Sequence, residues 1–268
     1  MLLKFKIFFR GFQMTPGSSR NCRILVDSPQ SGAVNMAIDE TLLNTGMRGI
    51  ATLRFYQWSA PTVSLGHFQA AQGQFVPDRF QGLEVVRRLS GGGAILHHRE
   101  LTYSCVLPVW HPITKDPGCL YDQIHDAIVE VLQQFHVTCA PRGDAAFPDT
   151  PFLCFARGDE RDLVCGSHKI VGSAQRRRQG TILQHGSILL KQSEWASEFP
   201  GIEELTGQNI LPEELIPPLI QAIASRLDLV PQSGELSAEE HSGIESLVEQ
   251  TALVPRTGSQ SFPFEVRS

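Results

Sequence analysis

The sequence contains none of the short motifs that define the common hydrolases and metalloenzymes. There is no H-E-x-x-H pair, Walker loop or G-x-S-x-G elbow, and the nine histidines form no closely spaced ligand cluster. The six cysteines include no C-x-x-C pair, so neither a zinc site nor a thioredoxin-like site is indicated. We therefore predict no metal centre and no serine-hydrolase chemistry.

Excess positive charge and long hydrophobic runs are absent as well. A net charge of −5 and an isoelectric point near 6.0 argue against a nucleic-acid-binding protein, which normally carries a basic surface. The apolar segment 1–14 is interrupted by Lys4, Lys6 and Arg10, which leaves no predicted membrane span or signal sequence. With ordinary globular composition and cysteines that we expect to be reduced, the sequence predicts a cytoplasmic protein that binds neither nucleic acid nor membrane.

Two parts are predicted along the chain. Met14 is followed by Thr-Pro-Gly-Ser-Ser, a composition typical of a linker or tail. Residues 1–20 are therefore predicted to be a disordered extension, or sequence upstream of the true start codon. From residue 21 to 268, short β-rich runs alternate with a few helices, without repeats or low-complexity segments, and this pattern predicts a single domain of the α+β class.

Apolar periodicity and capping signals predict the individual elements. Helices are expected at 34–43 and at 121–135, where apolar residues recur at helical spacing. Two more are expected to begin at Pro218, since proline suits a first turn, and at Ser237, whose Glu240 completes a capping box. Strands are predicted at 52–58, 62–65, 83–89, 94–97, 101–107, 152–155, 163–164, 169–171 and 182–190, the first two joined by a turn.

Two segments carry residues suited to binding an acyl or phosphate group. In 87–94, Arg87, Arg88 and Ser90 precede three glycines, so that backbone N–H groups and positive charge are available to a carboxylate, phosphate or thioester oxygen. A glycine-rich hairpin without a ligand is the alternative. Lys169 precedes an apolar pair and a turn of small residues. A functional lysine there would be partly buried, whereas an ordinary strand lysine points to solvent.

Two other features have both inert and functional interpretations. Cys154 is flanked by apolar residues, where a cysteine is ordinarily a core residue, and the same interpretation applies to Cys165. A nucleophile needs a base or a cation beside its sulfur. The run Arg176-Arg177-Arg178 is interpreted as a solvated face, with docking of an acidic carrier protein as the alternative.

Several segments, taken together, resemble the biotin/lipoate protein ligase superfamily, and within it the lipoate branch. They are Asn35-Met36-Ala37-Ile38-Asp39-Glu40, Arg54-Phe55-Tyr56-Gln57-Trp58, Pro61-Thr62-Val63-Ser64-Leu65-Gly66, the stretch from Arg87 to His97 and the stretch from Lys169 to Arg176. Two long motifs in the right order are more specific than either alone. The resemblance implies a single catalytic domain over 21–268, with mixed and antiparallel sheets flanked by helices and a helical C-terminal part.

Within this branch the sequence resembles the octanoyltransferases of the Gram-positive type. Glu100-Leu101-Thr102-Tyr103-Ser104 stands where ATP-dependent lipoate ligases have an Asp-x-Gly-Asn stretch, and Gln184-His185-Gly186-Ser187-Ile188 matches the same type. Cys154-Phe155 lies about fifteen residues before Lys169, as in that type. The other octanoyltransferase type has its cysteine after the lysine, where this chain has none.

The resemblance also implies which residues form the site. Cys154 is implied as the nucleophile and Lys169 as the residue that holds its thiolate and the developing oxyanion, with Cys165 as a rival nucleophile. The segment 156–164 is charged and matches nothing in the family. The implied substrate-binding residues are Arg87, Arg88, Ser90, Gly91, Gly92, Gly93, Ala94, His97, Gly172, Ser173 and Ala174.

The implied reaction is transfer of an octanoyl group from acyl carrier protein, through a cysteine thioester, to a lysine of lipoyl domains of 2-oxoacid dehydrogenases or of glycine cleavage H protein. No cofactor is required. ATP and magnesium enter only if the chain is instead an ATP-dependent lipoate–protein ligase acting through lipoyl-AMP. A non-catalytic relative that binds carrier protein is the third possibility, and biotin ligase is disfavoured because its Gly-Arg-Gly-Arg signature is absent.

Overall fold

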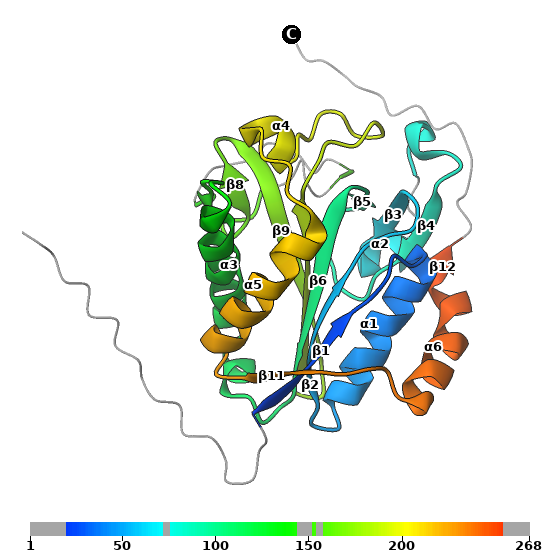
Figure 1. Ribbon diagram of the computed structural model, residues 1–268. Coiled ribbons are helices and arrows are strands. Elements are labelled where there is room, and N and C mark those ends of the chain that lie inside the picture. The colour runs from blue at the N-terminus through cyan, green and yellow to red at the C-terminus, as the bar shows by residue number, and fades with distance from the viewer. Residues whose placement is uncertain (1–19, 72–75, 144–151, 154–157, 254–268) are drawn as a thin grey trace, which may run out of the picture.

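Two β-sheets with helices around them form the molecule (Figure 1). The computed structural model describes residues 20–71, 76–143, 152–153 and 158–253. Within these residues, one sheet has eight strands and the other has four. The predicted α+β class, with mixed and antiparallel sheets flanked by helices, is confirmed. The extension predicted at 1–20 lies outside the described residues except for its last residue.

The larger sheet has the strand order β11-β1-β2-β6-β10-β9-β8-β7. In this sheet β1 runs parallel to β2 and β11, and the other neighbours are antiparallel. The central strands β6 and β10 are buried along their whole length. The bounds are β1 (Asn21–Val26), β2 (Ala51–Tyr56), β6 (Glu100–Leu107), β7 (Ala140–Pro141), β8 (Leu163–Cys165), β9 (His168–Arg178), β10 (Thr181–Leu189) and β11 (Val230–Ser233).

The smaller sheet has the order β12-β4-β3-β5 and a core of its own. Val63, Leu65, Val85 and Leu96 pack there against Phe80. Here β3 runs parallel to β4, whereas the β3–β5 and β4–β12 pairs are antiparallel. The bounds are β3 (Thr62–Leu65), β4 (Glu84–Arg87), β5 (Ile95–His97) and β12 (Ala252–Leu253).

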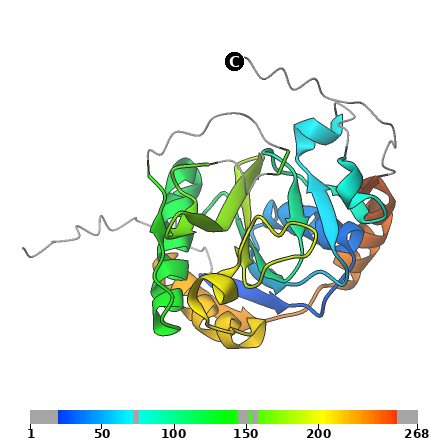
Figure 2. The ribbon, with the colours of Figure 1, turned by 90° about the horizontal axis from the view of Figure 1, so that it is seen from above.

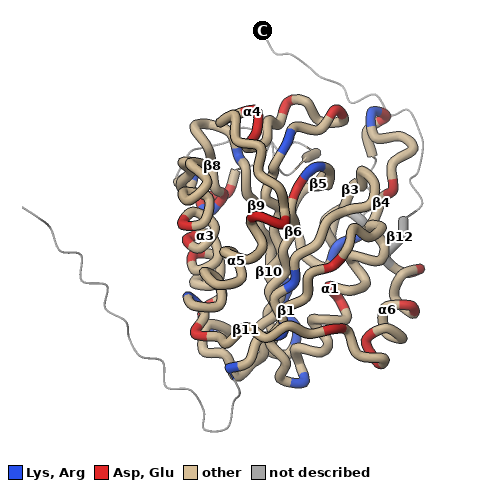
Figure 3. Tube along the Cα trace, in the orientation of Figure 1, with Lys and Arg blue, Asp and Glu red and all other residues tan. Residues whose placement is uncertain are grey.

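Helices cover both faces of the larger sheet. On one face, α3 (Pro117–Gln134) and α5 (Pro212–Arg226) join its main core. On the other, α1 (Gly32–Gly46) contacts both the larger sheet and β4, and α6 (Ala238–Thr251) packs against α1. Figure 2 shows α3 and α6 at opposite sides of the molecule, and Figure 3 shows acidic residues along both. The short helices are α2 (His67–Ala71), η1 (Asp78–Phe80), η2 (Pro112–Lys115) and α4 (Ile202–Thr206).

The predicted helices are confirmed except for one start. The helices expected at 34–43 and 121–135 are α1 and α3. The Ser237 hydroxyl accepts a hydrogen bond from the Glu240 N–H (3.2 Å), and the Glu240 carboxylate accepts one from the Ser237 N–H (2.8 Å), as in a capping box. No helix in the described ranges is long and apolar enough to cross a membrane.

The helix start expected at Pro218 is wrong, because α5 begins at Pro212 and contains Pro217 and Pro218. The Glu214 carboxylate accepts a hydrogen bond from the Leu211 N–H (2.9 Å), which fixes the true start. A proline inside a helix removes one backbone hydrogen bond, but its φ is compatible with helical geometry. The buried face of α5 continues through the prolines, so packing maintains the helix there.

The predicted strands are confirmed where they can be compared, although their pairing was not foreseen. The strands expected at 52–58 and 62–65 are β2 and β3, which follow each other in sequence but belong to different sheets. The strand expected at 152–155 falls largely outside the described residues; Leu153, within it, forms an isolated bridge with Ala94.

Candidate active site

A cavity of about 380 Å³ is lined by residues of both sheets. Residues of β9 and β10 line it from the larger sheet, and the loop from β4 to β5 lines it from the smaller one. Met36 of α1, Tyr56 of β2 and Tyr121 of α3 also contribute to its walls. Its volume lies within the range of about 300–1,000 Å³ that is typical of sites for small ligands.

Most residues predicted for the site meet in this cavity. Those that line it are Arg88, Gly91, Gly92, Gly93, His97, Lys169, Gly172, Ser173 and Ala174. Arg87, Ser90 and Ala94 belong to the same loop region but are not among the lining residues. Cys154 lies outside the described residues; before it Leu153 pairs with Ala94, and after it Gly158 lines the cavity.

The glycine loop, residues 90–93, is held by Arg88. Its guanidinium donates hydrogen bonds to the carbonyl oxygens of Gly91 (2.7 Å), Gly93 (2.6 Å) and Ser64 (2.8 Å). A side chain at Gly66 would collide with the Gly92 carbonyl, and Gly92 itself has φ +93°. Arg88 therefore lines the cavity and also fixes the backbone of the loop.

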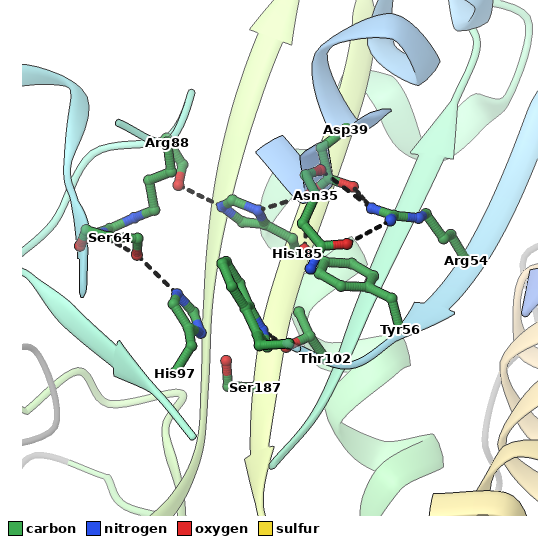
Figure 4. Close-up of polar contacts among 12 residues, drawn as sticks. Asn35, Asp39, Arg54, Tyr56, Ser64, Arg88, His97, Thr102, His185 and Ser187 are labelled. Atoms are coloured by element: carbon green, nitrogen blue, oxygen red, sulfur yellow. Dashed lines mark hydrogen bonds and ion pairs between the residues drawn. The ribbon is translucent and has the colours of Figure 1, made fainter. Parts of the chain in front are cut away.

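His185 connects the glycine loop to α1 (Figure 4). Its Nδ1 lies 3.2 Å from Asp39 Oδ2 and its Nε2 lies 2.5 Å from Ser90 Oγ. Because a carboxylate only accepts hydrogen bonds, His185 Nδ1 carries a hydrogen. The predicted residue Ser90 is fully buried and therefore anchors the loop rather than facing the cavity.

Asp39 belongs to a buried ionic network. The Arg54 guanidinium donates to Asp39 (2.9 Å) and to Asp27 (2.7 Å), and Tyr56 donates to Asp39 (3.0 Å). Burial alone would raise the pKa of Asp39, but the His185 hydrogen bond and the Arg54 charge outweigh burial and lower it. Asp39 is therefore ionised at neutral pH and fixes the orientation of His185.

Glu100 forms a second network around His97. Its Oε1 accepts hydrogen bonds from His97 Nδ1 (2.6 Å), Thr102 (2.7 Å) and Ser187 (2.8 Å), and His97 Nε2 lies 2.7 Å from Ser64 Oγ. Burial lowers the pKa of His97 despite the Glu100 charge, so its ring is neutral. The Glu100–Thr102 segment thus lies beside the cavity, with Thr102, His97 and Ser187 among the lining residues.

Lys169 is buried, as expected of a functional lysine, with 7% of its surface exposed. Its ammonium forms an ion pair with Asp162 (2.9 Å), whose other oxygen accepts from the Asp159 N–H (2.8 Å). A Cβ at Gly172 would lie 2.5 Å from Lys169 Cε and 2.8 Å from its Nζ, so a larger residue there would displace the end of the lysine side chain. A fixed positive charge therefore faces the cavity.

The described cysteines differ in reactivity and position. Burial raises the pKa of Cys22 to about 12 and of Cys139 to about 11, and it also raises the pKa of Cys105 well above the ordinary value of a thiol. The Cys119 pKa is raised mainly by its hydrogen bond to Asp116. Cys165 is half-buried against the main core and does not line the cavity.

Several site residues were not identified from the sequence. Asp39, Glu100 and His185 stood inside motifs that carried the resemblance, and that position was their only signal. No signal in the sequence pointed to Asp162, because it lies in the charged segment 156–164, which matches nothing in the family. Its partner Lys169 was predicted, but the pairing depends on the fold of β8 onto β9.

The comparison with protein families agrees with this fold. Residues 31–222 match the model of the lipoyl protein ligase A/B catalytic domain. The chain therefore belongs to this family, and the resemblance to the lipoate branch is confirmed.

The relatives within the family include proteins named Octanoyltransferase LipM. The one from Geobacillus kaustophilus is 32% identical over 249 residues, which cover 80% of this chain and 89% of that protein. The one from Oceanobacillus iheyensis is 36% identical over 177 residues, or 63% of this chain and 64% of the relative. The second alignment thus spans less than two thirds of its relative.

Solved structures show the same fold at lower identity. A lipoate-protein ligase A bound with ATP aligns with a TM-score of 0.69 and 21% identity, covering 86% of this chain and 95% of that chain. A bi-partite lipoate protein ligase from Thermoplasma acidophilum, studied with its E2 lipoyl domain, aligns with a TM-score of 0.67 and 20% identity. This alignment covers 86% of this chain and 92% of that chain.

Proposed function

We propose that this chain transfers an octanoyl group from octanoyl-acyl carrier protein to a specific lysine of lipoyl domains, through a thioester on Cys154. The proposal rests on one observation above all. In a chain similar to octanoyltransferases, a buried ammonium, Lys169, lies in a cavity beside a glycine loop. Such a site suits a thioester carbonyl that becomes an oxyanion during transfer.

In the first half-reaction the Cys154 thiolate attacks the carbonyl carbon of the octanoyl thioester. The new carbon–sulfur bond forms, the carrier thiol leaves, and the octanoyl group remains on the enzyme. The Lys169 ammonium stabilises the oxyanion between these steps, and such a contact typically contributes about 10²-fold or more in rate. Lys169 also favours the thiolate form of a nearby cysteine.

The choice of Cys154 is supported by the other cysteines. Cys22, Cys105, Cys119 and Cys139 have raised pKa values and are protonated at neutral pH, which makes them poor nucleophiles. Cys165 remains the rival, but it lies outside the cavity lining. Cys154 follows Leu153, which is paired with Ala94 at the end of the glycine loop.

In the second half-reaction a lysine of the acceptor domain attacks the enzyme thioester and forms the octanoyl amide. We propose lipoyl domains of 2-oxoacid dehydrogenases or glycine cleavage H protein as acceptors. One structural neighbour was studied together with its E2 lipoyl domain. The reaction as written requires neither ATP nor a metal, whereas the alternative function, ATP-dependent lipoate ligation, requires both.

The test is the intact mass of the protein after incubation with octanoyl-acyl carrier protein without ATP. We expect one hydroxylamine-sensitive octanoyl adduct, which Cys154→Ala loses and Cys165→Ala, the matched control, retains. Loss of the adduct in Cys165→Ala alone would identify Cys165 as the nucleophile instead. The absence of any adduct, with transfer appearing only on addition of ATP and free acid, would show that the chain is a ligase.

A further inference from the structure

His125 and Ser173 form a buried pair at the wall of the cavity. His125 belongs to α3 and Ser173 to β9, and His125 Nε2 lies 2.7 Å from Ser173 Oγ. Only 3% of the His125 surface is exposed, whereas Ser173 is half-buried and lines the cavity. The histidine therefore reaches the cavity through the hydroxyl of the serine.

The hydrogen bonds around this pair have fixed directions. His125 Nδ1 lies 2.6 Å from the Arg161 carbonyl oxygen, which only accepts, so Nδ1 carries the hydrogen and Nε2 of the neutral ring accepts from Ser173. The Tyr103 hydroxyl lies 2.7 Å from Ser173 Oγ and itself accepts from Gln184 Nε2 (3.0 Å). Because the single Ser173 hydrogen is directed at His125, the Tyr103 hydroxyl is the donor in its contact with Ser173.

The surroundings keep His125 neutral at rest. Burial is the main reason that its pKa is lowered, and the Lys169 charge lowers it further. The Arg161 carbonyl and the carboxylates of Asp162 and Asp122 act in the opposite direction. Among the described residues, the phenols of Tyr103 and Tyr121 also lie near His125: Tyr103 is linked through Ser173, and the Tyr121 ring centroid lies 6.1 Å from the His125 ring.

We propose that Ser173 takes a proton from the ammonium of the acceptor lysine while it passes its own proton to His125, and that this step prepares the amine for attack on the enzyme thioester. The inference rests on the proposed function and adds the base that its second half-reaction needs. A lysine has a pKa of about 10.4 in water, so nearly all acceptor lysines arrive protonated at neutral pH.

The step balances in protons and bonds. The acceptor ammonium loses one proton to Ser173 as the Ser173 proton moves to His125 Nε2, and this leaves a neutral amine. The amine nitrogen forms a bond to the thioester carbon, the carbon–sulfur bond breaks, and the second proton of the nitrogen passes to the departing sulfur. His125 then returns its proton to solvent, and the enzyme recovers its thiol.

The other two histidines of the cavity do not offer this route. The ring nitrogens of His97 are bonded to Glu100 and Ser64, and those of His185 to Asp39 and Ser90. Both serines are fully buried and are not lining residues, so neither can receive a proton from a ligand. Ser173 is the histidine-bonded serine of these three that faces the cavity.

The test separates the two half-reactions. Octanoyl-enzyme is prepared with octanoyl-acyl carrier protein, freed of donor, and mixed with a lipoyl domain while the loss of the adduct is followed by quenched-flow mass spectrometry. The variants are His125→Gln, which can still hydrogen-bond to Ser173 but cannot take its proton, and Ser173→Ala. His111→Gln is the control, because His111 is also buried and bonded to a backbone carbonyl (Leu227, 2.8 Å).

We expect His125→Gln and Ser173→Ala to acquire the adduct at nearly the wild-type rate but to lose it to the lipoyl domain about 10²-fold more slowly at pH 7. Between pH 7 and 9 the variant rates should rise about tenfold per pH unit with the free-amine fraction, while the wild-type rate stays nearly level. A structural defect would not produce this pH dependence.

The possible contrary results are distinct. If both variants discharge the adduct like the wild type and His111→Gln, or are slowed equally at every pH, the assignment to His125 and Ser173 is wrong. If wild-type enzyme never acquires an adduct, the proposed thioester mechanism itself fails. If His125→Gln does not fold, Ser173→Ala decides, since it removes the hydroxyl from the cavity wall and leaves the histidine in place.

Discussion

Gly172 is the residue whose substitution tests the position of Lys169 most directly. In Gly172→Ala the new Cβ would lie 2.5 Å from Lys169 Cε, so the ammonium must move from its place in the cavity. We expect the rate of octanoyl-adduct formation to fall by about 10²-fold, the contribution typical of an oxyanion contact. Gly243→Ala is the control, because its Cβ would meet only Thr41, at 3.7 Å, and should leave the rate unchanged.

The Lys169–Asp162 pair makes a second prediction at this scale. Breaking a buried ion pair by neutralising one partner typically costs about 3–5 kcal/mol. Asp162→Asn should therefore lower the free energy of unfolding by this order, although its amide oxygen can still accept from the Asp159 N–H. Adding Lys169→Met removes the uncompensated charge and should recover much of the loss. Urea unfolding of the two single variants and the double variant measures this coupling, and simple additivity would contradict it.

At the scale of elements, the start of α6 holds the C-terminal helix to the first strand. The Glu240 carboxylate accepts a hydrogen bond from the Ser237 N–H in the capping box. It also accepts two hydrogen bonds from Arg23 of β1, each of 2.7 Å. Ser237→Ala removes the N-cap hydroxyl and should lower the free energy of unfolding by about 1 kcal/mol. Chemical denaturation measures the change, and Ser246→Ala, an exposed serine within α6, is the control. Equal effects of the two substitutions would count against the capping interpretation.

Elements could be predicted from the sequence where their signals are local. The apolar spacing of α3 and the capping pair Ser237 and Glu240 each involve residues close together in the sequence, and both predictions are confirmed. The sheet pairing of β2 and β3 is not local, because it depends on which distant strand lies beside each. The start of α5 was misjudged for a related reason, since burial of its apolar face outweighs the preference of Pro218 for a first turn.

The residues of the candidate site also differ in whether their signals are local in the sequence. The glycine loop and Lys169 lie in continuous motifs, so the sequence indicated both. Asp162, His125 and Asp39 belong to the site because they contact residues of other elements that are distant in sequence. Such contacts cannot be predicted from one segment of the sequence alone. Arg88, which was predicted to bind substrate, lines the cavity, and its hydrogen bonds to loop carbonyls also position the loop backbone.

At the scale of the whole molecule, buried histidines make stability depend on pH. His97, His111 and His125 each have a pKa below the ordinary value of 6.5, with burial as the largest cause. Below about pH 6.5 the unfolded chain therefore binds more protons than the folded chain. Their contribution is fully present above this pH and is lost as the pH falls toward the folded pKa values.

Urea unfolding at a series of pH values from 7.5 to 5 should therefore show a falling free energy of unfolding, because the unfolded chain takes up protons that the buried histidines of the folded chain do not. His111→Gln should flatten this decline, because it removes one of the titrating groups. His241→Gln, at an exposed position of α6, should leave the slope unchanged. An identical slope in all three proteins would contradict this account.

The sheet pairing also bears on the order in which the molecule is completed during translation. The parallel neighbour of β1 at the sheet edge is β11, and the neighbour of β4, just before the glycine loop, is β12. During translation β1 and β4 are synthesised long before their partners β11 and β12. The nascent chain thus carries two open strand edges for most of its synthesis, and edges of this kind invite aggregation. We expect the demand for chaperone protection to end only when the C-terminal helix and strand emerge.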